Sequence, residues 1–243
     1  MQFFDNITIY WGVCRISGIR TIWEGFDFSY ILSILLSLIP SLFCITLHEL
    51  NHGLAAYALG DDTAKNAGRL TLNPLKHLDV MGLLMLLVFH VGWAKPVPVN
   101  YYRFKDPKKG MALTAAAGPA ANVLISLVFM ILYGALFIPL GQSRVGSYFL
   151  QMIEYTSYIS LGLAVFNLLP VPPLDGSKVL FSVIKESAYE KLMLYERYGS
   201  IVLFALFATG ILGRPISDLV SFLYRQMLPL AQWACDIVLT FYK

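Results

Sequence analysis

The stretch 30–59 is predominantly apolar, and it is longer than the roughly twenty residues that a helix needs to cross a bilayer. A bilayer interior offers no water to bond backbone groups, so such a stretch has to fold as a helix. It nevertheless contains His48, Glu49 and His52, within the pentapeptide His-Glu-Leu-Asn-His. Ionisable side chains are costly at this depth and are usually functional. The sequence therefore predicts a membrane helix that contributes residues to a functional site.

The spacing of the two histidines indicates a metal site. Residues four apart lie on one face of a helix, so His48 and His52 are placed to bind one zinc ion through their imidazoles. Glu49 is placed to take a proton from a zinc-bound water. The alternative is that two polar histidines only pack against neighbouring helices. We favour the metal site because the full pattern is specific and lies in a spanning segment.

The composition places the chain in a membrane. Of the 243 residues, 57% are hydrophobic and 14% are charged, and the mean hydropathy is +0.65. The net charge of +3 is small and the basic residues fall between apolar runs, so nucleic acid is not an expected partner. Cys14, Cys44 and Cys235 form no CxxC pair, which predicts neither a disulfide framework nor a thiolate metal site.

The apolar runs predict an all-α polytopic membrane protein with about five to six membrane segments. They cover 30–59, 78–93, 111–140, 156–170 and 199–213, with a weaker run at 216–241. In the weaker run, Asp218, Arg225 and Gln232 recur at the spacing of one helical stripe. We expect residues 29–243 to form a single membrane-embedded domain, because no repeat or linker separates a second one.

Two segments need a different interpretation. Residues 1–28 show no signal-peptide pattern and mix aromatic with charged side chains, which predicts an interfacial aromatic arm. The run 78–93 is short for an upright span and has basic residues on both flanks. We expect it to dip into the membrane and return, or to span only part of it. The charge bias then puts the loop near Arg144 outside and the stretch 178–197 on the cytoplasmic side.

Asp175 is the candidate third metal ligand, since a catalytic zinc usually keeps three protein ligands and one water. It ends the segment Asn-Leu-Leu-Pro-Val-Pro-Pro-Leu-Asp that begins at Asn167. The prolines forbid a regular helix there, and unwound chain at membrane depth normally lines a polar cavity. The alternative is a plain turn outside a helix. The pairing with the histidine motif favours the ligand.

Three motifs in this order resemble the site-2 protease family of intramembrane zinc metalloproteases, peptidase family M50. They are the HELNH motif at 48–52, the Ala-Gly-Pro-Ala-Ala-Asn segment at 117–122, and the N-x-x-P-x-P-x-L-D-G segment at 167–176. The resemblance covers roughly residues 35–215. The segments 68–77 and 92–100 look like the compact bacterial branch, and we expect no room for a PDZ or CBS domain.

The resemblance implies a three-helix catalytic core in a bacterial cell membrane, with the active site nearer the cytoplasmic side. His48, His52 and Asp175 would hold one zinc ion per chain, and Glu49 would be the general base. Asn122 would project toward the site to hold substrate or stabilise the oxyanion. Members of the family cleave transmembrane segments of membrane-anchored proteins, so transmembrane proteins and the lipid bilayer are the expected partners. The sequence carries no signal for an oligomeric state.

The stretch 94–100 predicts a small extended element, because Pro96 and Pro98 alternate with Val97 and Val99. An unwound substrate is expected to pair with Val97 and Val99 as an added strand. The alternative is an inert connector.

Other features have structural interpretations. The lone histidines His77 and His90 are expected to serve turns or cavities, and Lys178 to anchor the topology. Two other functions remain open: a membrane metal transporter, and a homologue that binds membrane helices without cutting them. The intact Glu49 favours the enzyme, since neither alternative needs a base.

Overall fold

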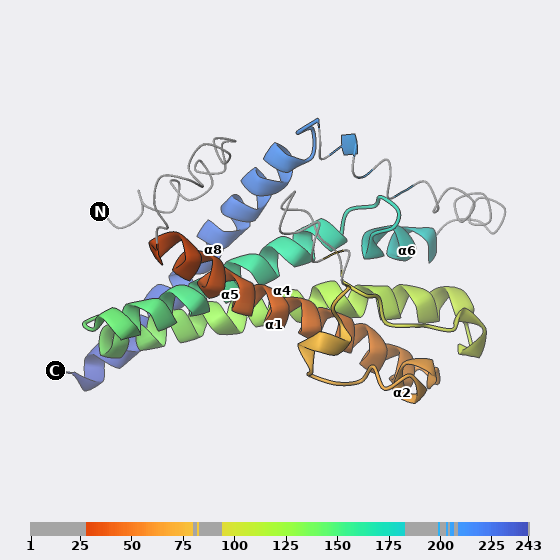
Figure 1. The fold of residues 1–243 in the computed structure, drawn as a ribbon, viewed down its shortest axis with the longest axis horizontal. Coiled ribbons are helices and arrows are strands. Elements are labelled where there is room, and N and C mark those ends of the chain that lie inside the picture. The colour runs from red at the N-terminus through yellow and green to blue at the C-terminus, as the bar shows by residue number, and fades with distance from the viewer. Residues whose placement is uncertain are drawn as a thin grey trace. The chain divides into compact units, whose positions relative to one another are not determined.

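The computed structural model describes residues 28–79, 94–182 and 209–242, together with single positions at 82, 199, 203, 205 and 206. The described residues are predominantly helical and contain no sheet (Figure 1). The long helices are α1 (Phe28–Ala58), α4 (Pro107–Leu140), α5 (Arg144–Asn167) and α8 (Gly213–Phe241), and α6 (Asp175–Ser182) is short. The predicted all-α class is confirmed.

Short elements connect α1 to α4. They are the helix α2 (Thr63–Asn66) and the 3-10 turns η2 (Pro74–Lys76) and η3 (Tyr101–Arg103). Residues 95–100 have no regular secondary structure, and Leu78 and Ala94 form an isolated antiparallel bridge. The predicted extended element therefore consists of one bridge at Ala94 and residues 95–100, which pair with no strand among the described residues. We call residues 95–100 the extended stretch.

The chain divides into two compact units, Met1–Leu35 and Leu36–Lys243. In the first unit, the described residues are those of the start of α1, from Phe28. The predicted interfacial arm lies outside the described residues except for Phe28. The second unit contains everything described below.

Three helices are long and apolar enough to cross a membrane, within the described part of the chain. They are Ile34–Ala58 of α1, Pro107–Leu140 and Arg144–Asn167. The protein is therefore an integral membrane protein. The run predicted at 156–170 belongs to a helix that begins earlier, at Arg144. The predicted runs 78–93 and 199–213 lie largely outside the described residues, so the segment count stays a prediction.

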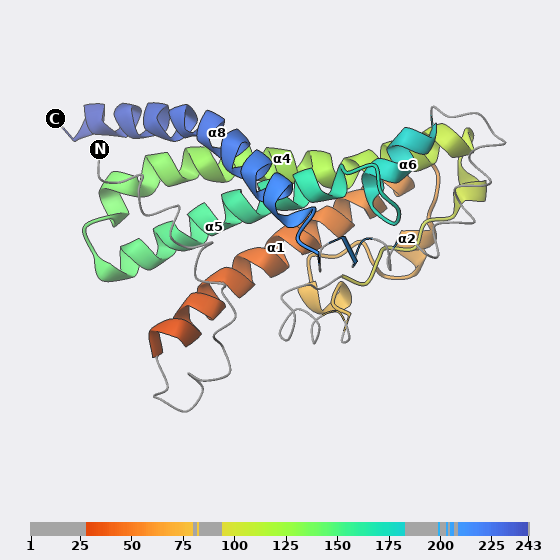
Figure 2. The same cartoon turned by 90° about the horizontal axis from the view of Figure 1, so that it is seen from above.

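Helices α4 and α5 form an antiparallel pair joined by a tight turn (Figures 1 and 2). Asp106 caps α4 by accepting a hydrogen bond from the Lys109 N–H, and Pro107 occupies the first turn, where no N–H is needed. Ser143 caps α5 by accepting from the Gly146 N–H at 2.9 Å. These caps fix where each helix begins.

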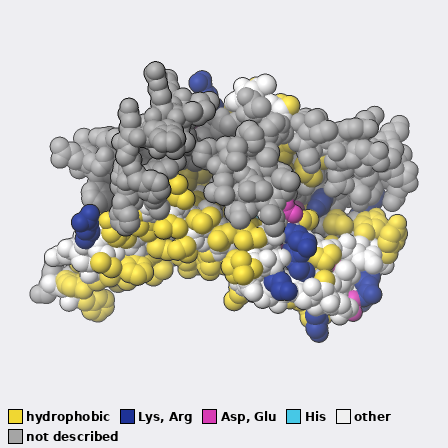
Figure 3. Space-filling view, viewed as in Figure 1, with side chains coloured by type: hydrophobic (Ala, Val, Ile, Leu, Met, Phe, Trp, Pro, Cys, Tyr) yellow, Lys and Arg dark blue, Asp and Glu magenta, His cyan; other side chains and the backbone are white. Residues whose placement is uncertain are grey.

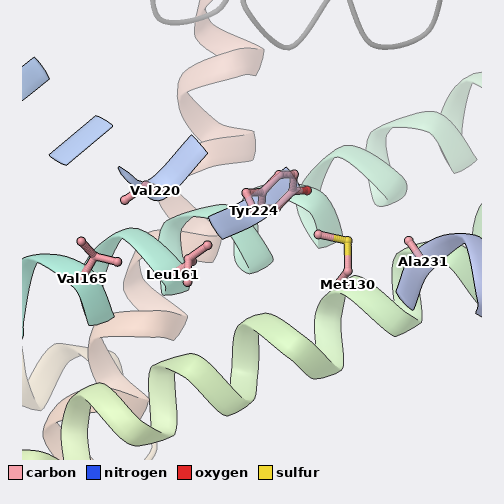
Figure 4. Close-up of a cluster of buried hydrophobic side chains, with 6 residues drawn as sticks. All are labelled: Met130, Leu161, Val165, Val220, Tyr224 and Ala231. Atoms are coloured by element: carbon pink, nitrogen blue, oxygen red, sulfur yellow. The ribbon is translucent and has the colours of Figure 1, made fainter. Parts of the chain in front are cut away.

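The apolar core lies where α8 packs on α4 and α5 (Figure 4). It consists of Met130 from α4, Leu161 and Val165 from α5, and Val220, Tyr224 and Ala231 from α8. The predicted polar stripe of α8, at Asp218, Arg225 and Gln232, lies on the exposed side. Helix α8 therefore packs with its apolar face and leaves its polar face outside the bundle.

The outer surface is divided by polarity. Large apolar side chains face outward along the long helices, and Leu124 and Val128 of α4 are 62% and 50% exposed. On the face drawn in Figure 3, hydrophobic side chains cover the helices, and most Lys and Arg side chains gather at the end where α2 lies. Such a surface suits a bilayer, with the charged end at the interface.

Candidate metal centre

Helix α1 places the two histidines of the HELNH motif one turn apart, on a face that is buried. His48 and His52 are 6% and 8% exposed. Their rings meet edge to face with centroids 4.5 Å apart, and the two Nε2 atoms are 3.0 Å apart. Two imidazole nitrogens so close together need either a shared proton or a shared cation between them.

Asp175 reaches this face because the chain turns sharply before α6. The Leu174 N–H bonds to the Val171 carbonyl, and the Ser177 N–H and hydroxyl both bond to the Leu174 carbonyl. Asp175 is thereby fixed at the first position of α6 and is 8% exposed. The proline-rich segment thus interrupts the helix just ahead of the carboxylate, as the sequence predicted.

The carboxylate completes a triangle with the two imidazoles. Asp175 Oδ2 lies 3.2 Å from His48 Nε2 and 3.1 Å from His52 Nε2. Burial alone would raise the pKa of Asp175, but the hydrogen bonds and charge of the two histidines outweigh burial and hold that pKa well below its usual range. The carboxyl group is therefore an anion, which is the form that binds a metal.

This triangle fits a zinc ion. A tetrahedral zinc with bonds of about 2.0–2.1 Å holds its ligand atoms about 3.3 Å apart. The three candidate ligand atoms lie within 4.8 Å of one another, and the three side chains are buried. Two nitrogens and one carboxylate oxygen are also a donor set that zinc accepts. The residues present could therefore hold the ion and leave one coordination position for water.

Helix α4 closes over the histidines at Gly118. A Cβ atom at this position would lie 2.5 Å from His52 Cε1 and 2.7 Å from His48 Cε1, which no side chain tolerates. The absence of a side chain lets α4 approach the two rings. The packing partners of α4 at this position are the rings of His48 and His52.

Helix α4 also contacts the far nitrogens of both rings. His52 Nδ1 lies 2.7 Å from the Thr114 carbonyl oxygen, and the Asn122 side-chain amide lies 3.1 Å from His48 Nδ1. Asn122 is fully buried. The structure thus places Asn122 against the back of a histidine ring, and it is not among the described residues that line the adjacent cavity.

Glu49 faces the extended stretch before α4. Its Oε2 accepts a hydrogen bond from the Val97 N–H at 3.0 Å. One carboxylate oxygen of Glu49 is thus held by the backbone, one residue along the helix from His48. Val97 is buried, and its backbone N–H is directed at Glu49.

The extended stretch is fastened at both ends. At its start, the Lys95 N–H bonds to the His77 carbonyl, and Arg69 donates to the Lys95 carbonyl at 2.6 Å. At its end, the Asn100 N–H bonds to Asp61 Oδ2 at 2.6 Å. These anchors hold Val97 beside Glu49.

Asp61 is a supporting residue that the sequence analysis missed. It is fully buried just after α1 and accepts hydrogen bonds from Thr63 and Asn100. Burial raises the pKa of Asp61, but these hydrogen bonds and the charge of Arg103 outweigh burial and lower it. Its only sequence signal was its place in the Gly-Asp-Asp that follows the apolar run, which marks a loop.

Three residues that the sequence analysis set aside as structural are His77, His90 and Lys178. His77 is 1% exposed, and its Nε2 lies 2.9 Å from the Thr71 carbonyl oxygen, so it stabilises a turn as predicted. His90 lies outside the described residues. Lys178, predicted to be a topology anchor, has its Nζ 4.0 Å from Asp175 Oδ1.

A cavity of about 530 Å³ opens on the triangle. Glu49 and the three candidate ligands line one part of it, and Pro96, Val97 and Val99 line another. The remaining lining is mainly apolar and comes from α1, α4, α5, α6 and the segment before α6. It includes Ile45, Met111, Leu163, Phe166 and Leu174, together with the two lysines Lys108 and Lys178. The candidate ligands, Glu49 and the extended stretch therefore line one cavity.

Comparison with known proteins connects this arrangement to a family. Residues 134–213 match the model of peptidase family M50, a range that includes Asp175. A protein of Bacillus subtilis named "Putative zinc metalloprotease YwhC" is 41% identical over 170 residues, which cover 68% of this chain and 76% of that protein. The chain belongs to peptidase family M50.

More distant relatives of this M50 chain have similar names. "Putative zinc metalloprotease Rip2" of Mycolicibacterium smegmatis is 28% identical over 200 residues, covering 81% of this chain and 75% of that protein. "Putative zinc metalloprotease MJ0611" of Methanocaldococcus jannaschii is 34% identical over 161 residues, covering 64% and 76% respectively. No solved structure matches the chain. The family resemblance inferred from three motifs is confirmed.

Proposed function

We propose that this protein is a zinc metalloprotease that hydrolyses peptide bonds within or near transmembrane segments of membrane-anchored proteins. One observation carries the proposal: Asp175 Oδ2 and the Nε2 atoms of His48 and His52 lie 3.0–3.2 Å apart. The two histidines and Glu49 lie on α1, which is long and apolar enough to cross a membrane, and Asp175 begins α6. The names of the M50 relatives support zinc as the ion and proteolysis as the reaction.

The residues divide the reaction between them. His48, His52 and Asp175 would hold zinc, which when bound supplies a water of lowered pKa and polarises the scissile carbonyl. Glu49 would accept a proton from the attacking water as the water oxygen bonds to the scissile carbonyl carbon, and would return this proton to the amide nitrogen as the C–N bond breaks. The Val97 N–H fixes one Glu49 oxygen and so orients the carboxylate. The products are a new carboxyl end and a new amine end.

The substrate has to unwind before it reaches Glu49. In an intact helix each carbonyl is bonded to an N–H four residues on and wrapped by side chains. The cavity next to Glu49 has a mainly apolar lining, which suits an unwound membrane segment. We therefore expect a preference for spans with Gly, Pro or Asn, whose helices open at lower cost.

The extended stretch is the proposed docking edge for the unwound segment. In an extended chain, alternate residues direct N–H and C=O to the same side. Because the Val97 N–H is directed at Glu49, the backbone of Val97 and Val99 is directed at the cavity that both residues line. Val99→Pro removes one N–H from this edge and leaves the Val97–Glu49 bond in place. We expect Val99→Pro to raise KM, with Val99→Ala as the control; an unchanged KM would support the inert connector.

We place the protein in a bacterial cell membrane with the site nearer the cytoplasmic side. Basic residues gather at the end that carries α2, as cytoplasmic ends do (Figure 3). Single cysteines at Lys65 and Lys105 should be labelled from the same, cytoplasmic side, and one at Arg144 from the opposite side. Labelling of Lys65 and Lys105 from opposite sides would contradict this topology.

Reconstituted protein tests the enzymatic proposal. The probes are single-span reporter proteins whose spans contain Gly-Pro, with an all-Leu span as the control substrate. We expect cleavage by the wild type, a loss of at least about 100-fold in Glu49→Gln, and loss with a chelator that added zinc restores. Glu154→Gln is the matched control, because Glu154 lies on α5 and does not line the cavity.

Two results would contradict the proposal. One is cleavage that persists in Glu49→Gln or after removal of the metal. The other is wild-type protein that binds the Gly-Pro reporter without cutting it, which would indicate the non-proteolytic alternative. Zinc flux into the vesicles that Glu49→Gln leaves unchanged would indicate the transporter.

A further inference from the structure

We propose that Asn122 is a positioning residue that fixes the tautomer of His48, so that Nε2 of this ring presents a lone pair to the metal. The inference rests on the proposed metal site. It assigns Asn122 to the ligand and not to the substrate or the oxyanion, and it follows from four features of the site.

The first feature is location. Asn122 is fully buried on α4, and its amide lies 3.1 Å from His48 Nδ1. The other nitrogen of the same ring, Nε2, lies 3.2 Å from Asp175 Oδ2. Asn122 and the candidate metal position therefore lie on opposite sides of one imidazole. A side chain in that place acts on the ligand, because the ring stands between it and the metal.

The second feature is the chemistry that a metal demands of the ring. A neutral imidazole carries one proton, and it binds a cation only through the nitrogen without one. Coordination through Nε2 thus requires a proton on Nδ1, and a buried Nδ1–H requires an acceptor. Asn122 Oδ1 is buried and has no hydrogen-bond partner among the described residues. Half a turn of the amide, whose two ends have nearly the same shape, brings Oδ1 to the Nδ1–H.

The third feature is the matching arrangement at His52. Its Nδ1 lies 2.7 Å from the backbone carbonyl of Thr114, which can only accept, so the proton of His52 is on Nδ1 and its Nε2 is available. Thr114, Gly118 and Asn122 follow one another at one-turn spacing along one face of α4. The Thr114 carbonyl and the Asn122 side chain thus lie on α4 one turn before and one turn after Gly118. One helix therefore sets the tautomers of both histidines.

The fourth feature is the support of Asn122 itself. The fully buried Ser160 of α5 donates a hydrogen bond from its hydroxyl to the backbone carbonyl of Asn122 at 2.9 Å. This bond ties the backbone of Asn122 to α5. Replacing the hydrogen-bond partner of a metal-binding histidine, the place that Asn122 has here, typically lowers metal affinity 10- to 100-fold.

Zinc affinity provides the main test, measured on purified full-length protein in detergent by competition with a chromogenic chelator. Asn122→Leu keeps the size and removes the acceptor, and we expect it to weaken zinc binding about 10- to 100-fold. Asn122→Asp keeps an acceptor at the same place, and we expect affinity within about threefold of wild type. Ser126→Ala is the matched control, since Ser126 is also buried on α4 but bonds to Ser157.

A purely structural role for Asn122 makes a different forecast. In that case Asn122→Leu would lower the melting temperature of the metal-free protein and leave the zinc affinity of the folded fraction unchanged. The metal-free melting temperatures of all variants are therefore measured alongside the affinities. Asn122→Leu with wild-type zinc affinity would overturn the inference, and so would Asn122→Asp that loses as much affinity as Asn122→Leu.

A second measurement needs no variant at position 122. In zinc-loaded wild-type protein with ¹⁵N-labelled histidine, we expect the His48 ring to show a protonated Nδ1 and a metal-bound Nε2. Coordination through Nδ1 would overturn the inference. His48→Ala separates this failure from failure of the site itself: zinc binding that His48→Ala leaves intact contradicts the proposed function, whereas zinc binding lost in His48→Ala but kept in Asn122→Leu contradicts only the role of Asn122.

Discussion

The two halves of α4 are buried by different means. Near its start, Thr114, Gly118 and Asn122 face the histidines of α1, and the buried contacts are polar and fixed atom by atom. Farther along, Met130 and Gly134 face α8, and the contacts are apolar or steric. The first half depends on which atom carries a proton, and the second depends on shape. A substitution in one half should therefore have little effect on the property that the other half controls.

The largest effect is expected at the glycine of the metal half. Gly118→Ala places a methyl group against both rings and should weaken zinc binding at least about 100-fold, since both ligands must move. The helix content should stay at the wild-type level. Chelator competition and circular dichroism measure the two properties. Gly162→Ala on α5 is the control, because its Cβ would meet nothing within 4 Å. Normal zinc affinity in Gly118→Ala would remove the distinction between the halves.

The apolar half should respond to lost volume. Met130 is fully buried between α5 and α8, so Met130→Ala should lower the free energy of unfolding by about 2–5 kcal/mol. Met130→Leu nearly conserves volume and should cost less than about 1.5 kcal/mol. Denaturant titration in detergent micelles checks both values. Zinc affinity of the folded protein should be the same in the two variants, and a tenfold difference would show that the halves are coupled.

Gly134 sharpens the comparison, because it is the apolar counterpart of Gly118. A Cβ at Gly134 would lie 2.6 Å from the carbonyl carbon of Ala231, in the backbone of α8. Gly134→Ala should therefore push α8 away and cost about 1–3 kcal/mol of stability. Its zinc affinity should remain that of wild type. The pair Gly118→Ala and Gly134→Ala thus separates metal binding from stability on one helix, provided that each is measured for both.

The smallest effect is expected at Asp61, which lies outside α4 and anchors the extended stretch next to Glu49. The pKa of Asp61 is lowered in the folded protein, so its contribution to stability is present above the pKa of an unfolded Asp, about 4, and is lost as the pH falls through the lower folded value. Asp61→Asn should cost about 1 kcal/mol at neutral pH. Its stability should then depend less on pH below about 4 than that of wild type. Thermal unfolding at several pH values tests this, and parallel curves would contradict it.

The sequence predicted the apolar parts of the helices better than their ends. Hydropathy located the apolar parts of α1 and α4, but it missed the first turns of α4, where Lys108 and Lys109 follow the Asp106 cap, and the first half of α5. Helix ends are set by capping groups, whereas hydropathy marks only the part that faces lipid.

The candidate site was predictable where the chemistry lies in side-chain types at fixed spacing. His48, Glu49 and His52 share one helix turn, and Asp175 follows a run of prolines, so the sequence pointed to all four. The roles of Gly118 and of the Thr114 carbonyl depend on where they lie and not on a side-chain type. A carbonyl is present at every residue, and the need for a glycine is evident only where α4 meets the two rings, so the motif at 117–122 did not reveal these contacts.

The order of the ligands along the chain has a consequence for biosynthesis. Asp175 follows His48 by 127 residues. The ribosome has therefore synthesised α1, α4 and α5 before it makes the carboxylate that completes the triangle. An unfinished chain carries both imidazoles but lacks the third candidate ligand, so it would hold a metal ion more weakly than the finished chain. If the proposed function is right, cleavage would have to wait until synthesis has passed Asp175.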